Sequence, residues 1–170
     1  MSDSLEARPA ILYTVPLYRQ HMTNLCWAFC RIMLDEYRHK PDGAFLTQRE
    51  AMKKARDMAA ASYKGRNPLR RRNHLGSTPS ADAGPVTTVD ELYDLLKLHG
   101  PLYATFGMRF GKHSIVVTGA DPAAGTVSFN DPHGRQKAQS FPDFVRGKGM
   151  SLFFRYRLLK IRIPPEGSVI

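Results

Sequence analysis

Apolar residues recur at helical spacing through the first hundred residues, and three helices are predicted there. The first begins at Thr23 or Asn24, because either side chain can cap a helix, and its apolar face then follows: Leu25, Phe29, Ile32 and Met33. The second helix covers residues 47–63 and the third covers residues 88–100. Each of these two opens with a threonine followed three residues later by a glutamate, which is the pattern of a capping box.

From residue 101 onward the pattern changes to β-branched and aromatic runs separated by turn residues. These runs predict strands within residues 101–106, 113–120, 126–131 and 152–163. A hairpin connection is expected at 120–126, and one short helix at 140–147. Helices followed by antiparallel strands predict an α+β fold. Residues 1–170 are expected to form a single domain, in which 64–86 are a mobile basic loop.

The net charge of +10 raises the hypothesis of an acidic partner. Much of the excess positive charge lies inside the predicted loop, on Lys64, Arg66, Arg70, Arg71 and Arg72. No zinc-finger spacing, phosphate-binding glycine loop or aromatic-interleaved strand accompanies these residues. A solvated loop is therefore favoured and nucleic acid is not expected as the partner, although a non-catalytic basic module that binds nucleic acid or protein stays open as an alternative.

The two cysteines differ in what their positions allow. They lie four residues apart on one predicted helix, so they are poorly placed to bridge each other, and a free thiol in a reducing compartment is expected. Cys26 falls in the first turn, where helix N–H groups stabilise a thiolate and where its own amide has no intrahelical acceptor. Cys30 lies one turn deeper and is interpreted as a small buried hydrophobe.

Among six histidines, His113 is the candidate partner for that thiol. It opens a predicted strand, so its ring can project into a cleft while the strand behind it stays rigid. On the next strand, Val127 and Phe129 are expected in the core, which directs Asp131 towards His113. A carboxylate there would orient the imidazole and stabilise its cation.

Two separated motifs resemble the papain-like cysteine peptidases. Gln20 stands six residues before Cys26, which is followed by Trp-Ala-Phe, and His113 begins the motif HSIVVTG that ends at Gly119. The run VSFNDP looks closest to a compact bacterial branch that includes effector and leader-processing peptidases. The resemblance implies a papain-like fold, with N-terminal helices and the nucleophile at a helix N-terminus packed on a C-terminal antiparallel sheet.

The same resemblance implies roles for individual residues. Cys26 would be the nucleophile, His113 the general base and acid, and Asp131 the residue that orients it. The Gln20 side chain and the Cys26 amide would form the oxyanion hole. Residues expected to contact the substrate are Trp27, Gly111 and Lys112, and no metal ion or cofactor is expected.

The chain departs from the family pattern after the third triad position. The tryptophan found there in papain is absent, and the sequence instead reads DPHGR from Asp131. Asn130 therefore remains an alternative to Asp131 as the orienting residue. His133, two residues after Asp131, is a further candidate to line the cleft, but its interpretation as a turn histidine is favoured.

The predicted activity is hydrolysis of a protein substrate through a thioester. A peptidoglycan amidase or endopeptidase is the alternative enzyme, since such enzymes use a similar Cys–His arrangement. The N-terminal stretch lacks the basic and apolar regions of a Sec signal peptide, and no run approaches the length of a membrane span. We therefore expect an effector or toxin domain that is made in the bacterial cytoplasm, held by a cognate immunity protein, and delivered into a target cell by a specialised route.

Overall fold

Helices and strands segregate along the chain in the computed structural model, which describes residues 8–21, 24–63, 81–108, 111–148 and 157–163. The elements in chain order are β1 (Ile11–Leu12), α1 (Cys26–His39), α2 (Gln48–Tyr63), β2 (Ala81–Asp82), α3 (Val89–His99), β3 (Leu102–Met108), β4 (Gly111–Asp121), β5 (Thr126–Asp131), β6 (Arg135–Ser140), α4 (Phe141–Val145) and β7 (Arg157–Ile163). The α+β class predicted from the sequence is confirmed. Within the described part of the chain, no helix is both long enough and apolar enough to cross a membrane.

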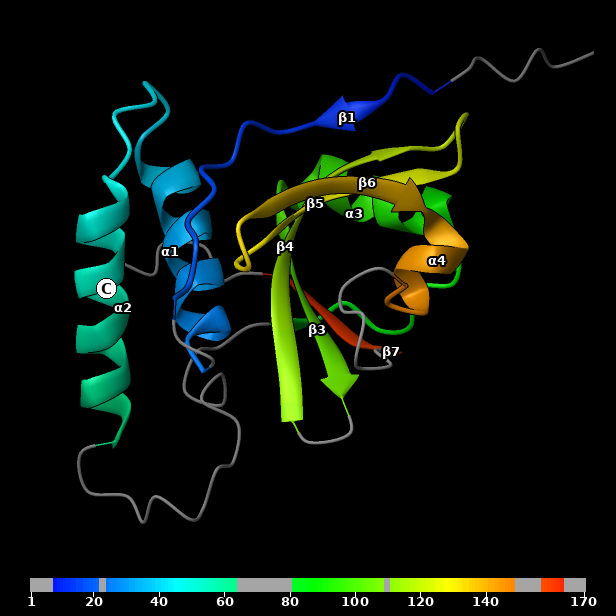
Figure 1. The fold of residues 1–170 in the computed structure, drawn as a ribbon. Coiled ribbons are helices and arrows are strands. Elements are labelled where there is room, and N and C mark those ends of the chain that lie inside the picture. Colours follow the sequence, from blue (N-terminus) through cyan, green and yellow to red (C-terminus); the bar gives the residue numbers. More distant parts are fainter. Residues whose placement is uncertain (1–7, 22–23, 64–80, 109–110, 149–156, 164–170) are drawn as a thin grey trace, which may run out of the picture.

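All strands of the described residues join one antiparallel sheet, in which β4 is the most extensively paired. The order is β2-β7-β3-β4-β5-β6, and β1 pairs separately with β4. Side chains of β4 alternate between two cores: Ile115 and Val117 pack with α3 and α4, whereas Val116 packs with α1 and α2. The sheet therefore lies between two helical layers, and α1 and α2 lie side by side in one of these layers (Figure 1).

The N-terminal segment pairs with the end of β4, beyond the part of this strand that pairs with β3, and it does so at a glycine. Ile11 pairs with Ala120 and Leu12 with Gly119 in the register of β1 and β4. A Cβ atom at Gly119 would lie 2.3 Å from the Ile11 carbonyl oxygen, a distance that no side chain tolerates. The absence of a side chain at this position is what lets the two backbones meet, and it fixes the course of the segment that leads to the first helix.

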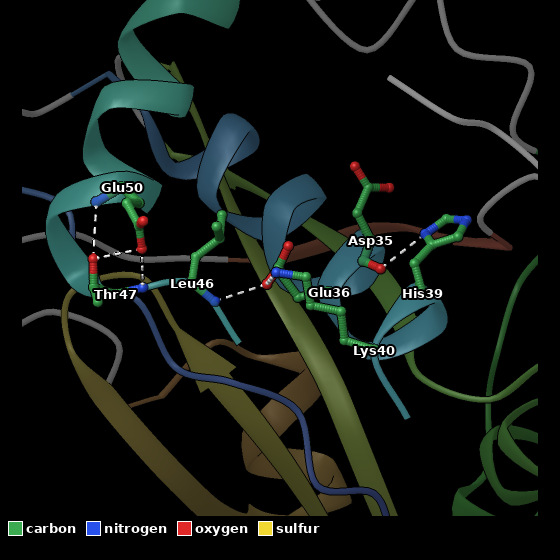
Figure 2. Close-up of polar contacts among 7 residues, drawn as sticks. All are labelled: Asp35, Glu36, His39, Lys40, Leu46, Thr47 and Glu50. Carbon is green, nitrogen blue, oxygen red and sulfur yellow. Dashed lines mark hydrogen bonds and ion pairs between the residues drawn. The ribbon is translucent and has the colours of Figure 1, made fainter. Parts of the chain in front are cut away.

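The predicted capping boxes of two helices are confirmed. The Thr88 side chain accepts a hydrogen bond from the Glu91 amide, and the Glu91 carboxylate accepts one from the Thr88 amide. Thr47 and Glu50 form the same reciprocal pair at the start of α2, as Figure 2 shows. Local sequence alone determines these two starts.

The predicted cap of α1 is wrong where the structure can test it. The helix begins at Cys26 with Leu25 in the cap position and no side-chain cap, while Asn24 lies in the preceding turn and Thr23 lies outside the described residues. Leu25 is buried in the core shared with Phe29, and its carbonyl accepts the Phe29 amide. Burial of an apolar side chain, rather than a polar cap, fixes this helix start and places Cys26 at its first position.

Three strands were not predicted, because each lacks the apolar pattern that identifies a strand. β6 has the sequence RQKAQS, is largely exposed and forms one edge of the sheet, where alternation of apolar residues is not needed. β1 and β2 have two residues each. β2 falls inside the predicted basic loop, of which residues 64–80 lie outside the described residues, as do residues 152–156 of the predicted last strand.

A buried carboxylate ties the end of α1 to the loop before α2 (Figure 2). Glu36 is 4% exposed, and its Oε2 atom accepts a hydrogen bond from the Leu46 amide at 2.8 Å and pairs with Lys40 Nζ at 3.0 Å. The Leu46 amide has no place in a helix or strand, so this carboxylate provides its acceptor. The contact holds α2 against the helix that carries Cys26.

Replacement of Glu36 by alanine should lower the free energy of unfolding by about 1–3 kcal/mol, because the Leu46 amide would lose its acceptor. The matched variant Glu36→Gln keeps a carbonyl oxygen at that place and should lose less, since the partly exposed pair with Lys40 contributes little. Chemical denaturation measures both. Equal losses in the two variants would contradict the role assigned to the hydrogen bond.

Candidate active site

The candidate nucleophile lies at the first position of α1. Cys26 is 7% exposed, and its amide belongs to the first turn of the helix, where N–H groups have no intrahelical acceptor. Its thiol is hydrogen-bonded to the His113 ring and to both the backbone and the side chain of Ser114. The helix N-terminus and the start of β4 thus meet at this sulfur.

The surroundings of Cys26 favour its thiolate. Burial alone would raise the pKa of the thiol, but hydrogen bonds and positive charge from His113, together with hydrogen bonds from Ser114, lower it below its usual value. Cys30 shows the contrast, because it is fully buried and burial raises the pKa of its thiol well above the usual range. Both cysteines are free thiols, as expected, but only Cys26 has the environment of a reactive one.

A hydrogen bond joins the second and third candidate residues. Nε2 of His113 lies 2.9 Å from Oδ1 of Asp131, and both side chains are almost completely buried. Since Nε2 is engaged by the carboxylate, Nδ1 is the ring nitrogen available to the Cys26 sulfur. The ring therefore lies between a thiol and a carboxylate.

The charges of this pair stabilise each other. Burial alone would lower the pKa of His113, but its hydrogen bonds to Asp131 and Cys26 and their negative charges raise it to about 9. Burial would likewise raise the pKa of Asp131, yet hydrogen bonds from His113 and His133 hold it far below its usual value. The pair is therefore an imidazolium and a carboxylate at neutral pH, and the positive charge beside Cys26 favours its thiolate over that of an ordinary cysteine.

Asn130, the alternative to Asp131, has other partners. Its side-chain amide donates to the Val15 carbonyl at 3.0 Å and to the Pro16 carbonyl at 3.4 Å. This fully buried side chain holds the N-terminal segment against the end of β5. Asp131 is therefore the residue that is hydrogen-bonded to His113, whereas the Asn130 amide binds the segment that leads to Gln20.

Gln20 lies next to the turn that follows Asp131. Its backbone amide donates to the Pro132 carbonyl at 2.7 Å, and its side chain is buried with Oε1 lacking a hydrogen-bond partner among the described residues. Through Pro132 and Asn130, the segment carrying Gln20 is fixed to the strand that carries the carboxylate. Its predicted part in an oxyanion hole stays a prediction.

The three residues expected to contact substrate lie around these groups. Trp27 is half-buried and packs against the core between α1 and α2. Gly111 and Lys112 are exposed at the start of β4, immediately before His113. Their expected contact with substrate also stays a prediction.

Sequence reasoning missed two residues of the site. Ser114, one position after His113, contacts the Cys26 thiol, and its hydroxyl accepts a hydrogen bond from the buried Tyr103 hydroxyl. His133 was interpreted as a turn residue, which it is, but its ring stacks on His113 with 4.6 Å between centroids. A serine inside an apolar strand and a histidine two residues after the carboxylate were the available signals.

The donor atoms of His113, Asp131 and His133 lie within 4.8 Å of one another, a set that could hold a metal ion. The two ring nitrogens concerned lie 2.9 and 3.3 Å from the same carboxylate oxygen, Asp131 Oδ1. A cation held by these atoms would replace the hydrogen bond between His113 and Asp131. It would therefore compete with the arrangement that keeps the imidazole charged.

Comparison with protein families gives one match that covers most of the chain. The family described as papain-like cysteine protease AvrRpt2 matches residues 9–148. This range contains Gln20, Cys26, His113 and Asp131. A comparison with curated proteins gives no match.

The pH dependence of alkylation should report the lowered pKa of Cys26. Iodoacetamide should label Cys26 at a lower pH than an ordinary thiol, because a group with a lowered pKa stays deprotonated further as the pH falls. Ser114→Ala should move the labelling profile to higher pH, since one hydrogen bond to the thiolate is lost. Labelling rates followed by mass spectrometry between pH 4 and 9 would show both. A profile centred on the usual thiol pKa would contradict the described environment.

Proposed function

The chain belongs to the family of papain-like cysteine protease AvrRpt2, a bacterial effector-type group of hydrolases, and from that membership we propose that Cys26, His113 and Asp131 are its catalytic triad. The single observation that carries the proposal is the buried chain of hydrogen bonds from the Cys26 thiol through the His113 ring to Asp131 Oδ1. A nucleophile, a base and an orienting carboxylate in that sequence are what acyl transfer through a thioester requires.

The first half of the reaction starts from the ion pair of the Cys26 thiolate and the His113 imidazolium. The Cys26 thiolate attacks the scissile carbonyl carbon, and the carbonyl π electrons move onto oxygen. When the tetrahedral intermediate collapses, the C–N bond breaks and the His113 imidazolium gives its proton to the leaving amine. The acyl group is then held by Cys26 as a thioester, and His113 is neutral.

The second half returns the site to its starting state. Neutral His113 takes a proton from water, the resulting hydroxide attacks the thioester carbon, and the C–S bond breaks to release the acid and the Cys26 thiolate. Asp131 stays ionised throughout, because it stabilises the imidazolium in the resting enzyme and orients the ring by its hydrogen bond to Nε2.

In this proposal the oxyanion formed in both halves is bound by the Cys26 amide and the Gln20 side-chain amide. The first-turn position of Cys26 leaves its amide available to an oxygen outside the helix. The attachment of the Gln20 backbone to Pro132 supports the second donor, because it fixes Gln20 beside the turn that follows the triad carboxylate.

The family membership favours a protein substrate over the two alternatives. A cysteine protease acts on proteins, whereas the peptidoglycan amidase alternative rests on a Cys–His pair alone. A non-catalytic binding module has no use for a buried thiolate that is hydrogen-bonded to an imidazolium, an arrangement that is costly unless its reactivity is needed.

We further propose that the protein is delivered from the bacterium that makes it and acts as an effector or toxin in another cell. An unrestrained peptidase endangers the cell that synthesises it, which supports a cognate immunity or inhibitor protein bound before delivery. The family membership supports the effector role. The specialised export route is part of the same proposal.

Cys26→Ala should abolish hydrolysis of a denatured protein, and Gln20→Ala should lower kcat by about 10²- to 10³-fold, the usual cost of losing one oxyanion donor. Cys30→Ala is the matched control, because Cys30 lies one turn deeper on the same helix and its buried thiol should not contribute to turnover. Fluorescence release from labelled denatured casein measures each variant. Full activity in Cys26→Ala, or labelling of Cys30 alone by an electrophilic thiol probe, would overturn the triad.

A lysate of susceptible cells treated with the wild-type protein should gain new protein N-termini that are absent after treatment with Cys26→Ala. Mass spectrometry of N-terminally labelled peptides would identify the substrate and the cleavage site. Purified cell wall treated in parallel should release no fragments. Wall fragments that depend on Cys26, without new protein N-termini, would establish the amidase instead.

A further inference from the structure

We propose that His133 is a positioning residue of the active site. Its backbone amide and ring nitrogen hold the Asp131 carboxylate, and the face of its ring holds the His113 ring. This inference rests on the proposed triad and adds a fourth side chain to it. The hydrogen bonds of the Cys26 thiol go to His113 and Ser114, whereas the contacts of His133 are with Asp131 and His113, so its effect is exerted through these two residues.

The first part of the inference comes from the carboxylate. Oδ1 of Asp131 accepts a hydrogen bond from the backbone amide of His133 at 2.9 Å and lies 3.3 Å from Nδ1 of the His133 ring. The same oxygen lies 2.9 Å from Nε2 of His113. Oδ2 of Asp131 has no hydrogen-bond partner among the described residues. His133 therefore supplies two of the three donors that fix the carboxylate orientation in the described structure.

The second part comes from the rings. The imidazoles of His113 and His133 are stacked, with centroids 4.6 Å apart and planes only 7° from parallel. His113 is 2% exposed, whereas the His133 side chain is 43% exposed. The outer ring thus covers the inner one, limits its rotation and keeps water from the hydrogen bond between His113 and Asp131, which is stronger when water is excluded.

The turn that carries His133 is itself held in place. The Gly134 amide donates to the Asp131 carbonyl, and the Pro132 carbonyl accepts the Gln20 amide. Gly134 has φ +83°, and a Cβ atom there would come within 3.0 Å of the Arg19 side chain. The hydrogen bonds of this turn to β5 and to the N-terminal segment support the position of His133 against His113.

Three substitutions separate the two contacts of His133. His133→Asn keeps a donor close to the position of Nδ1 but removes the ring; His133→Phe keeps a ring but removes the donor; His133→Ala removes both. His99→Ala is the matched control, because His99 is the last residue of α3 and has no part in the proposed triad. All variants are made in a Cys30→Ala background, so that Cys26 is the one thiol that can react.

The readout is the rate at which iodoacetamide alkylates Cys26 at pH 6, which depends on the thiolate that His113 stabilises. His133→Ala should slow this rate about 10-fold, and it should lower kcat on labelled casein by about 10- to 100-fold with KM within twofold, the cost of a misplaced catalytic group. The Asn and Phe variants should each recover part of both losses, and His99→Ala should match the wild-type protein.

An alkylation rate in His133→Ala within twofold of the wild-type rate would overturn the inference. A wild-type rate no higher than that of Cys26 in the denatured protein would overturn it as well. A rise in KM with unchanged kcat would also overturn it, because that result assigns His133 to substrate binding. If His133→Ala fails to fold, as thermal unfolding would show, the Asn and Phe variants decide in its place. Failure of the wild-type protein to cleave casein or any lysate protein would refute the proposed function, while the alkylation rates would still decide the role of His133.

Discussion

The burial of three ionisable groups against one another is the constraint on which the proposed active site depends. Asp131 has no exposed surface, and His113 and Cys26 have almost none. A lone charge in such a place would be strongly destabilised, so each group can be ionised only while its neighbour is. The carboxylate stabilises the imidazolium, and the imidazolium in turn lowers the pKa of the Cys26 thiol. The lowered pKa is thus a property of the buried group of side chains and not of the cysteine alone.

Because each group is stabilised by its neighbour, the three elements that carry these groups must keep a fixed position relative to one another. Cys26 is the first residue of α1, His113 lies near the start of β4, and Asp131 ends β5. The antiparallel pairing of β4 with β5 sets the distance between the imidazole and the carboxylate, and the packing of α1 on β4 sets the position of the sulfur. A displacement of β4 would remove the imidazolium and leave the negative charges of Cys26 and Asp131 without compensation. The sheet with helices on both faces provides the required rigidity.

The parts of this arrangement that follow local rules were predictable from the sequence. The helix starts at Thr47 and Thr88 are encoded by residues three positions apart, and the β4 strand by a continuous apolar run. The pairing of His113 with Asp131 followed from strand alternation together with the family resemblance.

What could not be predicted depends on contacts between distant segments or on position within the sheet. α1 starts where Leu25 is buried rather than where Asn24 could cap it, and β6 is a strand because of the neighbour it pairs with rather than its own residues. The contact of Ser114 with the thiol and the stacking of His133 on His113 arise only once the strands are paired. The sequence shows that these residues are polar, but it does not show what they face.

The attachment of the N-terminal segment has a consequence for the timing of synthesis. The segment carrying Gln20 is held by Thr118, Asn130 and Pro132, all from the second half of the chain. A nascent chain on the ribosome therefore exposes Gln20 and Cys26 long before the residues that contact their segment have been translated. Until the turn beyond Asp131 has emerged, the growing polypeptide has the thiol but not the imidazole and carboxylate that the proposed triad requires.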